Sequence, residues 1–176
     1  MYLLAGALLV ACIGAIWDVR TYRIPNVVTY PAICLGILAH LFVEGPKGLI
    51  WGVLGFLIGG GIFFFLYLLK TMGAGDVKLM AAVGAFAGPS KTLEIALYSA
   101  VAGGVLAVAV ALYKRRLRRT FGNVWDLVRF HAAVGASAHP SLNLDNPEAA
   151  RFAYGVAIFA GTLFVFVNFV FVNKVG

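Results

Sequence analysis

Residues 48–69 read GLIWGVLGFLIGGGIFFFLYLL, an apolar run without a single charged residue. A helix needs about 20 such residues to cross the hydrocarbon core of a bilayer. The rest of the chain has the same character, since its 176 residues are 62% hydrophobic and only 12% charged. A soluble domain carries about 25% charged residues. The sequence therefore predicts an all-α, polytopic membrane protein with a single domain, residues 1–176.

Further apolar segments lie on both sides of this run. With it they predict about six membrane helices, of which the fourth is too short to span fully by itself. The segments are residues 2–18, 27–43, 48–69, 76–88, 91–113 and 152–172. Gly45-Pro46 and Gly88-Pro89-Ser90 mark tight turns between them. The glycines within the third and fifth segments are expected to let helix backbones approach closely.

The basic residues are distributed unevenly between the two sides of this arrangement. With the N-terminus outside, the outer set is Lys47, Lys91 and Lys174. The cytoplasmic set is Arg20, Arg23, Lys70, Lys78, Lys114, Arg115, Arg116, Arg118, Arg119, Arg129 and Arg151. Loops rich in Lys and Arg stay in the cytoplasm, so the net charge of +7 indicates topology rather than nucleic-acid binding. We expect residues 1–18 to be a retained helix, because positive charges follow its apolar run instead of preceding it.

Residues 114–151 form the long polar connection of the predicted protein, on its cytoplasmic side. The basic run at residues 114–119 is expected to anchor the chain to an anionic lipid leaflet. Apolar side chains then recur at helical spacing, at Phe121, Val124, Trp125 and Val128. This spacing is typical of an amphipathic helix in the membrane interface. A lid over the active site is the alternative for this segment.

Two of the four aspartates lie where predicted membrane helices meet the cytoplasm. Asp18 lies at the end of the first apolar segment, and Asp76 closes the sequence Gly73-Ala74-Gly75-Asp76 before the fourth. A carboxylate at membrane depth is costly and therefore indicates a functional site. Asp76 at a helix start complements the helix dipole, whereas Asp18 at a helix end does not. Asp18 needs another reason to be there, and Arg20 or Arg23 is a candidate partner.

Paired carboxylates can hydrolyse a peptide bond without a metal or a covalent intermediate. Two like charges in close quarters do not both ionise easily, so one carboxylate can take a proton from water while the other donates one to the scissile carbonyl. The residues do not say which aspartate is the acid. Gly73 and Gly75 allow a positive φ or the close approach of a peptide backbone. Cys12 and Cys34 have no CxxC or Cys/His spacing, so no metal or cofactor is expected.

Two segments around these aspartates match a known family. Trp17-Asp18-Val19-Arg20-Thr21-Tyr22-Arg23-Ile24-Pro25-Asn26 and Gly73-Ala74-Gly75-Asp76-Val77-Lys78-Leu79-Met80 resemble the two active-site segments of the type IV prepilin peptidases. The second corresponds to the family's GxGDxKL. The stretch Tyr154-Gly155-Val156-Ala157-Ile158-Phe159-Ala160-Gly161 is similar to the family's last-helix segment. The resemblance covers almost the whole chain, with its segments in the same order.

The resemblance implies an aspartic membrane endopeptidase that needs no metal or cofactor. Its catalytic pair would be Asp18 and Asp76, supported by Gly73, Gly75, Lys78, Arg20 and Arg23. Its substrates would be type IV prepilins or pilin-like precursors, cut between a basic leader and a hydrophobic helix. Cleavage would take place at the cytoplasmic face of a bacterial or archaeal-type cytoplasmic membrane that contains anionic lipids.

The resemblance has one departure and gives two further residues a role. Larger members carry an N-terminal CxxC segment and also methylate the new N-terminus. This chain begins with its first helix, so it resembles the short, peptidase-only kind that serves Tad or Flp pili, and N-methylation is not expected. Lys78 is expected to lower the charge cost of the pair, to contact substrate, or to act only as a cytoplasmic anchor. Asn26 is expected to cap the second helix.

Two other interpretations stay open at the level of the sequence. A presenilin-like intramembrane protease also uses GxGD, but its first aspartate follows Tyr deep in a helix, whereas Asp18 follows Trp17 at a helix end. A proton-coupled transporter or a non-enzymatic assembly factor would use the acids as a relay. Activity on a purified precursor separates these classes. The sequence names neither the individual precursor nor the oligomeric state.

Overall fold

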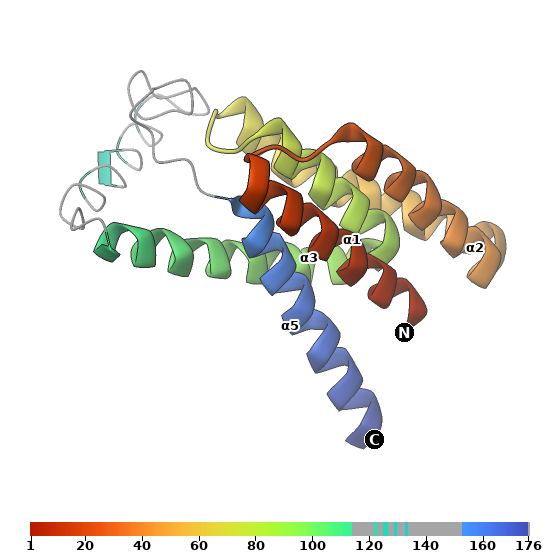
Figure 1. Ribbon diagram of the computed structural model, residues 1–176. Helices are drawn as coiled ribbons and strands as arrows, with labels where there is room; N and C mark the ends of the chain where they lie inside the picture. The colour runs from red at the N-terminus through yellow and green to blue at the C-terminus, as the bar shows by residue number, and fades with distance from the viewer. Residues whose placement is uncertain (114–121, 123–124, 127–128, 130–132, 134–152, 176) are drawn as a thin grey trace.

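The computed structural model describes residues 1–113, 122, 125–126, 129, 133 and 153–175. Its long helices are α1 (Tyr2–Thr21), α2 (Asn26–Leu68), α3 (Ala74–Tyr113) and α5 (Tyr154–Val175), shown in Figure 1. Each is long and apolar enough to cross a membrane. The predicted all-α membrane class is confirmed. The predicted orientation and number of membrane crossings stay predictions, and the interfacial helix expected within 114–151 falls almost entirely outside the described residues.

A glycine followed by a proline breaks each of the two longest helices. Gly45 in α2 has φ 67° and ψ −154°, and Gly88 in α3 has φ 74° and ψ 171°. These positive φ values favour glycine, and the prolines at 46 and 89 lack the N–H that would continue the helical ladder. The breaks lie where the sequence predicts tight turns. They divide α2 and α3 into four segments that correspond to the second to fifth predicted helices.

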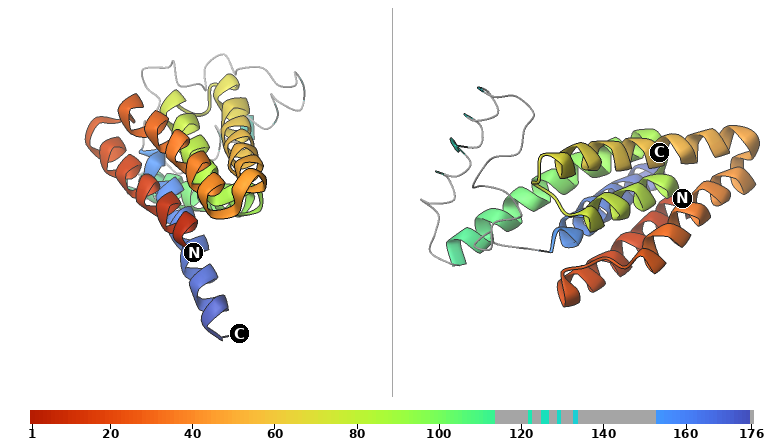
Figure 2. Two further views of the ribbon diagram at one scale, coloured as in Figure 1. Left: turned by 90° about the vertical axis from the view of Figure 1, so that its right-hand side faces the viewer. Right: turned by 90° about the horizontal axis from the view of Figure 1, so that it is seen from above.

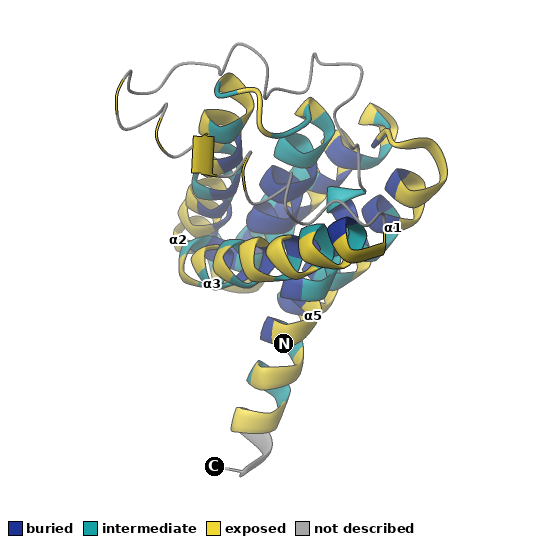
Figure 3. Cartoon of the chain, turned by 90° about the vertical axis from the view of Figure 1, so that its left-hand side faces the viewer, coloured by how far each residue is buried: buried dark blue, intermediate teal, exposed yellow. Residues whose placement is uncertain are grey.

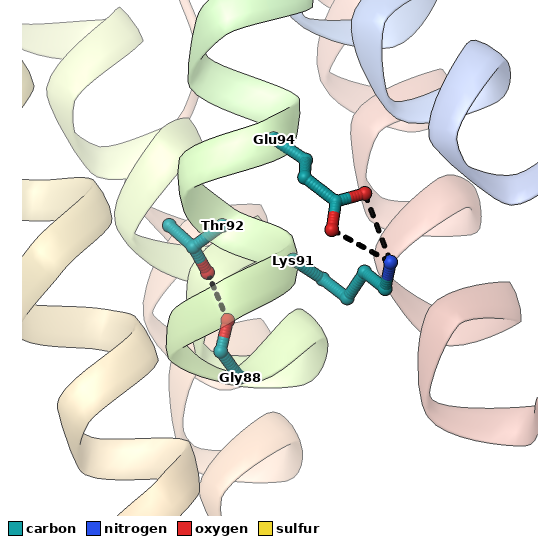
Figure 4. Close-up of polar contacts among 4 residues, drawn as sticks. All are labelled: Gly88, Lys91, Thr92 and Glu94. Carbon is teal, nitrogen blue, oxygen red and sulfur yellow. Dashed lines mark hydrogen bonds and ion pairs between the residues drawn. The ribbon is translucent and has the colours of Figure 1, made fainter. Parts of the chain in front are cut away.

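Polar side chains hold the break in α3. The hydroxyl of Thr92 donates to the carbonyl oxygen of Gly88 at 2.6 Å, and the Nζ of Lys91 lies 2.7 Å from Oε1 of Glu94 in the same turn (Figure 4). Nε2 of the buried His40 on α2 lies 3.1 Å from the carbonyl oxygen of Phe86. Because a carbonyl only accepts, this nitrogen carries the proton. Side chains from α3 and α2 therefore bind carbonyl groups at and just before the break.

Glycines set the distance between α2 and α3, the pair of helices with the largest contact. A Cβ on Gly55 would collide with the carbonyl oxygen of Gly84, and a Cβ on Gly84 would collide with the carbonyl oxygen of Gly55. The two backbones therefore touch, which side chains at these positions would prevent. Not every glycine has this role, since a Cβ on Gly61 or Gly104 would meet nothing within 4 Å. The packing role expected for the glycines of the third and fifth predicted helices therefore holds for some of them and not for others.

The helices α1 and α5 pack on each other and on α3 (Figure 2). The end of α1 and the starts of α2, α3 and α5 lie at one end of the bundle, the aspartate end. Figure 3 shows buried residues inside the bundle and exposed residues along the outer faces of the helices. These faces carry large apolar side chains such as Phe42, 83% exposed, and Leu97, 64% exposed. A surface of this kind fits contact with lipid rather than water.

The contact between Gly55 and Gly84 makes a direct prediction about stability. We expect Gly55→Ala to lower the free energy of unfolding by about 1–3 kcal/mol, because the added methyl group forces the two backbones apart. Gly61→Ala on the same helix segment should be neutral, or stabilising by up to about 1 kcal/mol from helix propensity. Unfolding of both variants in mild detergent, followed by circular dichroism, measures the difference. Equal stability of the two variants would contradict the close backbone contact.

Candidate active site

Asp18 lies in the last turn of α1, where the chain leaves the helix. Tyr22 adopts a left-handed conformation with φ 50°, and its N–H donates to the carbonyl oxygen of Asp18 at 2.8 Å. This arrangement is a common way to end a helix. Asp18 is only 6% exposed. Its carboxyl group therefore needs a partner inside the bundle.

The partner of the Asp18 carboxyl is the backbone at the start of α5. The N–H of Gly155 donates to Oδ2 of Asp18 at 2.7 Å. In the first turn of a helix, backbone N–H groups have no partner within the helix, and the helix dipole favours a negative charge there. The Asp18 carboxyl is at the C-terminal end of α1, where the helix dipole disfavours a negative charge. It lies at the N-terminal end of α5, where the dipole favours one. A Cβ at position 155 would lie 3.0 Å from both Cβ and Oδ2 of Asp18, so a larger residue there would have to displace the Asp18 side chain.

Asp76 lies in the first turn of α3 and is bonded to the residue before that helix. The N–H of Gly73 donates to Oδ2 of Asp76 at 3.2 Å, and the N–H of Asp76 donates to the carbonyl oxygen of Gly73 at 3.1 Å. Such a reciprocal pair resembles a capping box, in which an acidic residue in the first turn reaches back to the N-cap. The carboxyl orientation is therefore fixed by the start of its own helix. Asp76 remains partly exposed.

The two glycines of the GxGD sequence provide space and not an unusual backbone conformation. Within the described residues, positive φ at glycine occurs at the two helix breaks and not at Gly73 or Gly75, so that part of the expectation is wrong. A Cβ on Gly73 would lie 3.2 Å from Oδ2 of Asp76. A Cβ on Gly75 would lie 3.4 Å from Cβ of Ile24, in the connection between α1 and α2. Gly73 is therefore the tight position of the two, whereas a side chain at residue 75 would make ordinary contact with Ile24.

The structure places the two predicted catalytic residues at the same end of the bundle. The carboxyl groups of Asp18 and Asp76 lie within range of each other's charge, and the phenol group of Tyr154, at the start of α5, lies within range of Asp76. The hydroxyl of Tyr154 also donates to the carbonyl oxygen of Ser99 at 3.2 Å, and its ring lies edge-on to Phe63, with centroids 6.0 Å apart. Three helices, α1, α3 and α5, thus contribute to one site at the aspartate end.

Lys78 belongs to a different side of α3. Residues two apart on a helix point about 200° apart around its axis, so Lys78 and Asp76 face in opposite directions. The Nζ of Lys78 donates to Oδ1 of Asn26 at 2.9 Å and lies 5.4 Å from the centroid of the Tyr30 ring. The expected capping role of Asn26 is wrong, because α2 is capped by Pro25 without a side-chain bond. The Asn26 side chain instead joins the first turns of α2 and α3.

The two arginines predicted to support Asp18 lie at the surface. Arg20 and Arg23 are both exposed. The structure records no ion pair between either of them and Asp18 among the residues that it describes. Asp18 is held by the N–H of Gly155 instead. A supporting role for these arginines toward substrate stays a prediction.

Gly155 is the functional residue that reasoning from the sequence missed. The position of Asp18 at the wrong end of a helix dipole indicates that a donor is needed, but does not say where it comes from. The donor comes from a residue 137 positions further along the chain. Only the packing of α5 against α1 brings the two together. For metal ions, the described residues contain no group of three or more His, Cys, Asp and Glu side chains that could hold one.

Comparison with known proteins gives consistent matches to one group. Residues 3–108 match the sequence model of the type IV leader peptidase family. The prepilin leader peptidase/N-methyltransferase of Burkholderia pseudomallei (strain 1026b) is 31% identical over 126 residues, which cover 68% of this chain and 40% of that protein. Proteins of the same description from Xanthomonas campestris pv. campestris and Dickeya chrysanthemi are 29% and 34% identical over 124 and 111 residues. These matches cover 65% and 57% of this chain, and 43% and 38% of the relatives.

No solved structure matches the chain. The chain spans less than half the length of the curated relatives that it matches. The family match extends over more than half of this chain and includes both Asp18 and Asp76. The family predicted from the two active-site segments is confirmed, and this chain belongs to the type IV leader peptidase family.

Proposed function

We propose that this chain is a membrane endopeptidase that removes the basic leader from type IV prepilins or pilin-like precursors at the cytoplasmic membrane face. Membership of the leader peptidase family supports the reaction class, and the relatives are described as prepilin leader peptidases. The observation that carries the proposal is the placement of Asp18 and Asp76 at the aspartate end of the bundle, where a backbone N–H binds one oxygen of each carboxyl group. The family match favours this function over a transporter or an assembly factor.

In the proposed reaction the two carboxyls share one proton. The ionised carboxyl takes a proton from water, whose oxygen attacks the scissile carbonyl carbon, while the protonated carboxyl gives its proton to the carbonyl oxygen. The resulting tetrahedral intermediate carries two hydroxyl groups. One hydroxyl then returns its proton to the ionised carboxyl, the other carboxyl protonates the amide nitrogen, and the C–N bond breaks. The pair ends in its starting state, with water consumed and an acid and an amine released.

The hydrogen bonds indicate which carboxyl oxygens take part. Oδ2 of Asp18 accepts the N–H of Gly155, and Oδ2 of Asp76 accepts the N–H of Gly73. We infer that the two Oδ1 atoms, which accept no hydrogen bond within the described part of the chain, handle water and the scissile carbonyl. The backbone bonds would then keep both carboxyls aimed while protons move. Preorganisation of this kind is a large part of what a catalytic site contributes.

The depth of the site supports cleavage at the junction between leader and hydrophobic segment. Asp18 is in the last turn of α1 and Asp76 in the first turn of α3, so both lie near an end of the bundle and not at its middle. A precursor with a polar leader in water and an apolar helix in lipid would present its junction at that depth. The Lys and Arg distribution predicts that this end of the bundle faces the cytoplasm.

Replacing either aspartate tests the mechanism. We expect Asp18→Asn and Asp76→Asn each to lower cleavage by about 10²–10⁴-fold, because asparagine keeps the shape of the side chain but cannot exchange the proton. The measurement is cleavage of a co-expressed pilin precursor from the same genome, with equal amounts of inserted enzyme. The mass of the product gives the cleavage site and also shows whether a methyl group has been added.

The outcomes of this experiment separate the hypotheses. Near-normal cleavage by either variant would make that aspartate structural and the two-carboxyl mechanism wrong. If the wild-type enzyme cleaves no precursor, the transporter or assembly interpretation becomes the better one.

Replacing Gly155 tests whether the start of α5 positions Asp18. We expect Gly155→Ala to lower kcat by about 10²-fold with little change in KM, because a Cβ would displace the Asp18 carboxyl and small displacements of catalytic groups have effects of this size. Gly104→Ala is the matched control, since a Cβ there meets nothing within 4 Å. Equal kcat values for the two variants would show that Gly155 does not position Asp18.

A further inference from the structure

A groove of about 360 Å³ opens between α2 and α3. Tyr30 and Ile33 line it from the first half of α2, and Leu57 and Phe64 from the second half. Val77, Lys78 and Ala81 line it from α3. Its walls are therefore apolar except for Lys78, the one charged residue that lines it. The groove begins near the starts of α2 and α3, and its lining extends over about two helical turns of the second half of α2.

This groove lies on the side of α3 that faces away from the aspartate pair. At about 100° per residue, the α3 residues that line it point about 100–200° away from Asp76 around the helix axis. A substrate bound at the two carboxyls would lie on the other side of the helix. The groove is therefore separate from the site described above.

Lys78 gives the mouth of the groove a positive charge, and no carboxylate of α1, α2, α3 or α5 forms an ion pair with it. Its Nζ donates to the neutral Asn26 amide oxygen and lies near the Tyr30 ring. Of the acidic residues in α1, α2, α3 and α5, Glu44 and Glu94 lie near the breaks at the opposite end of the bundle. The other two, Asp18 and Asp76, belong to the site on the far side of α3. An anion at the mouth would complete this end of the groove.

We propose that the groove binds an anionic phospholipid, with the phosphate group at the Nζ of Lys78 and an acyl chain along the apolar walls. Lys78 lies within the first two turns of α3, at the depth where a helix end meets the headgroup region, and the walls extend from there into the hydrocarbon layer. A long apolar chain with a negative group at one end matches both features. The proposal does not depend on the peptidase reaction.

Native mass spectrometry of the purified full-length protein tests the site. The protein is equilibrated in micelles with equal amounts of phosphatidylglycerol and phosphatidylcholine that carry the same acyl chains. We expect phosphatidylglycerol to be retained about five-fold more, the factor that one lysine near an anionic lipid supplies. Lys78→Gln should bring the ratio close to one, and Lys78→Arg should keep it. Lys47→Gln is the matched control, because Lys47 is an exposed lysine beside the break of α2, at the opposite end of the bundle.

A second variant tests the apolar walls independently of charge. Ala81→Trp fills the groove and should lower the retention of both lipids. Equal retention of the two lipids by the wild-type protein, a preference that survives Lys78→Gln, or unchanged retention by Ala81→Trp would each overturn the proposal. Displacement of phosphatidylglycerol by a purified pilin precursor would also overturn it, because the groove would then take substrate and not lipid.

Discussion

The hydrogen bond from the Gly155 N–H to Oδ2 of Asp18 joins the start of α5 to the end of α1, and the site depends on it. A buried carboxyl at the C-terminal end of a helix faces that helix's unfavourable dipole end. The first turn of α5 offers a free N–H and the opposite dipole end. The bond also limits what the neighbouring positions can be, since residue 155 has no room for a side chain. The geometry of α5 is thus coupled directly to the orientation of Asp18.

A second constraint fixes the position of Asp76. α3 enters the bundle against α2, and their backbones touch through Gly55 and Gly84. The side chains of Leu79 and Met80, in the turn that follows Asp76, are fully buried. A helix fixed in this way has little freedom to rotate or slide, so its first turn keeps a set position. Asp76 then needs only its local bond to Gly73 to be aimed. Tight glycine packing distant from the carboxyls thereby fixes one half of the site.

The helices, their breaks and the two candidate aspartates can be predicted from short stretches of the sequence. Apolar length gives the helices, the Gly-Pro pairs at 45–46 and 88–89 give the breaks, and two acids at helix ends give the catalytic candidates. Contacts between segments that are distant along the chain cannot be predicted in this way. Nothing near Asp18 indicates that its donor is Gly155, and exposed Arg20 and Arg23 are the nearer candidates along the chain. Asn26 has the chemistry of a helix cap, but its side chain is directed to Lys78 because the starts of α2 and α3 lie side by side.

The most direct test measures the NMR chemical shifts of the Gly155 and Gly73 backbone amides, which bind the Asp18 and Asp76 carboxyl groups. Tyr154-Gly155 and Met72-Gly73 are the only Tyr-Gly and Met-Gly pairs in the chain. Pairwise labelling with ¹³C-carbonyl tyrosine or methionine and ¹⁵N-glycine therefore isolates each amide in an NMR spectrum of the protein in nanodiscs. If the carboxyls form one coupled unit, both amide shifts follow pH through the same two steps, and Asp76→Asn reduces the Gly155 titration to one step. A Gly155 amide shift that does not respond to pH, or that is unchanged by Asp76→Asn, would contradict the paired site.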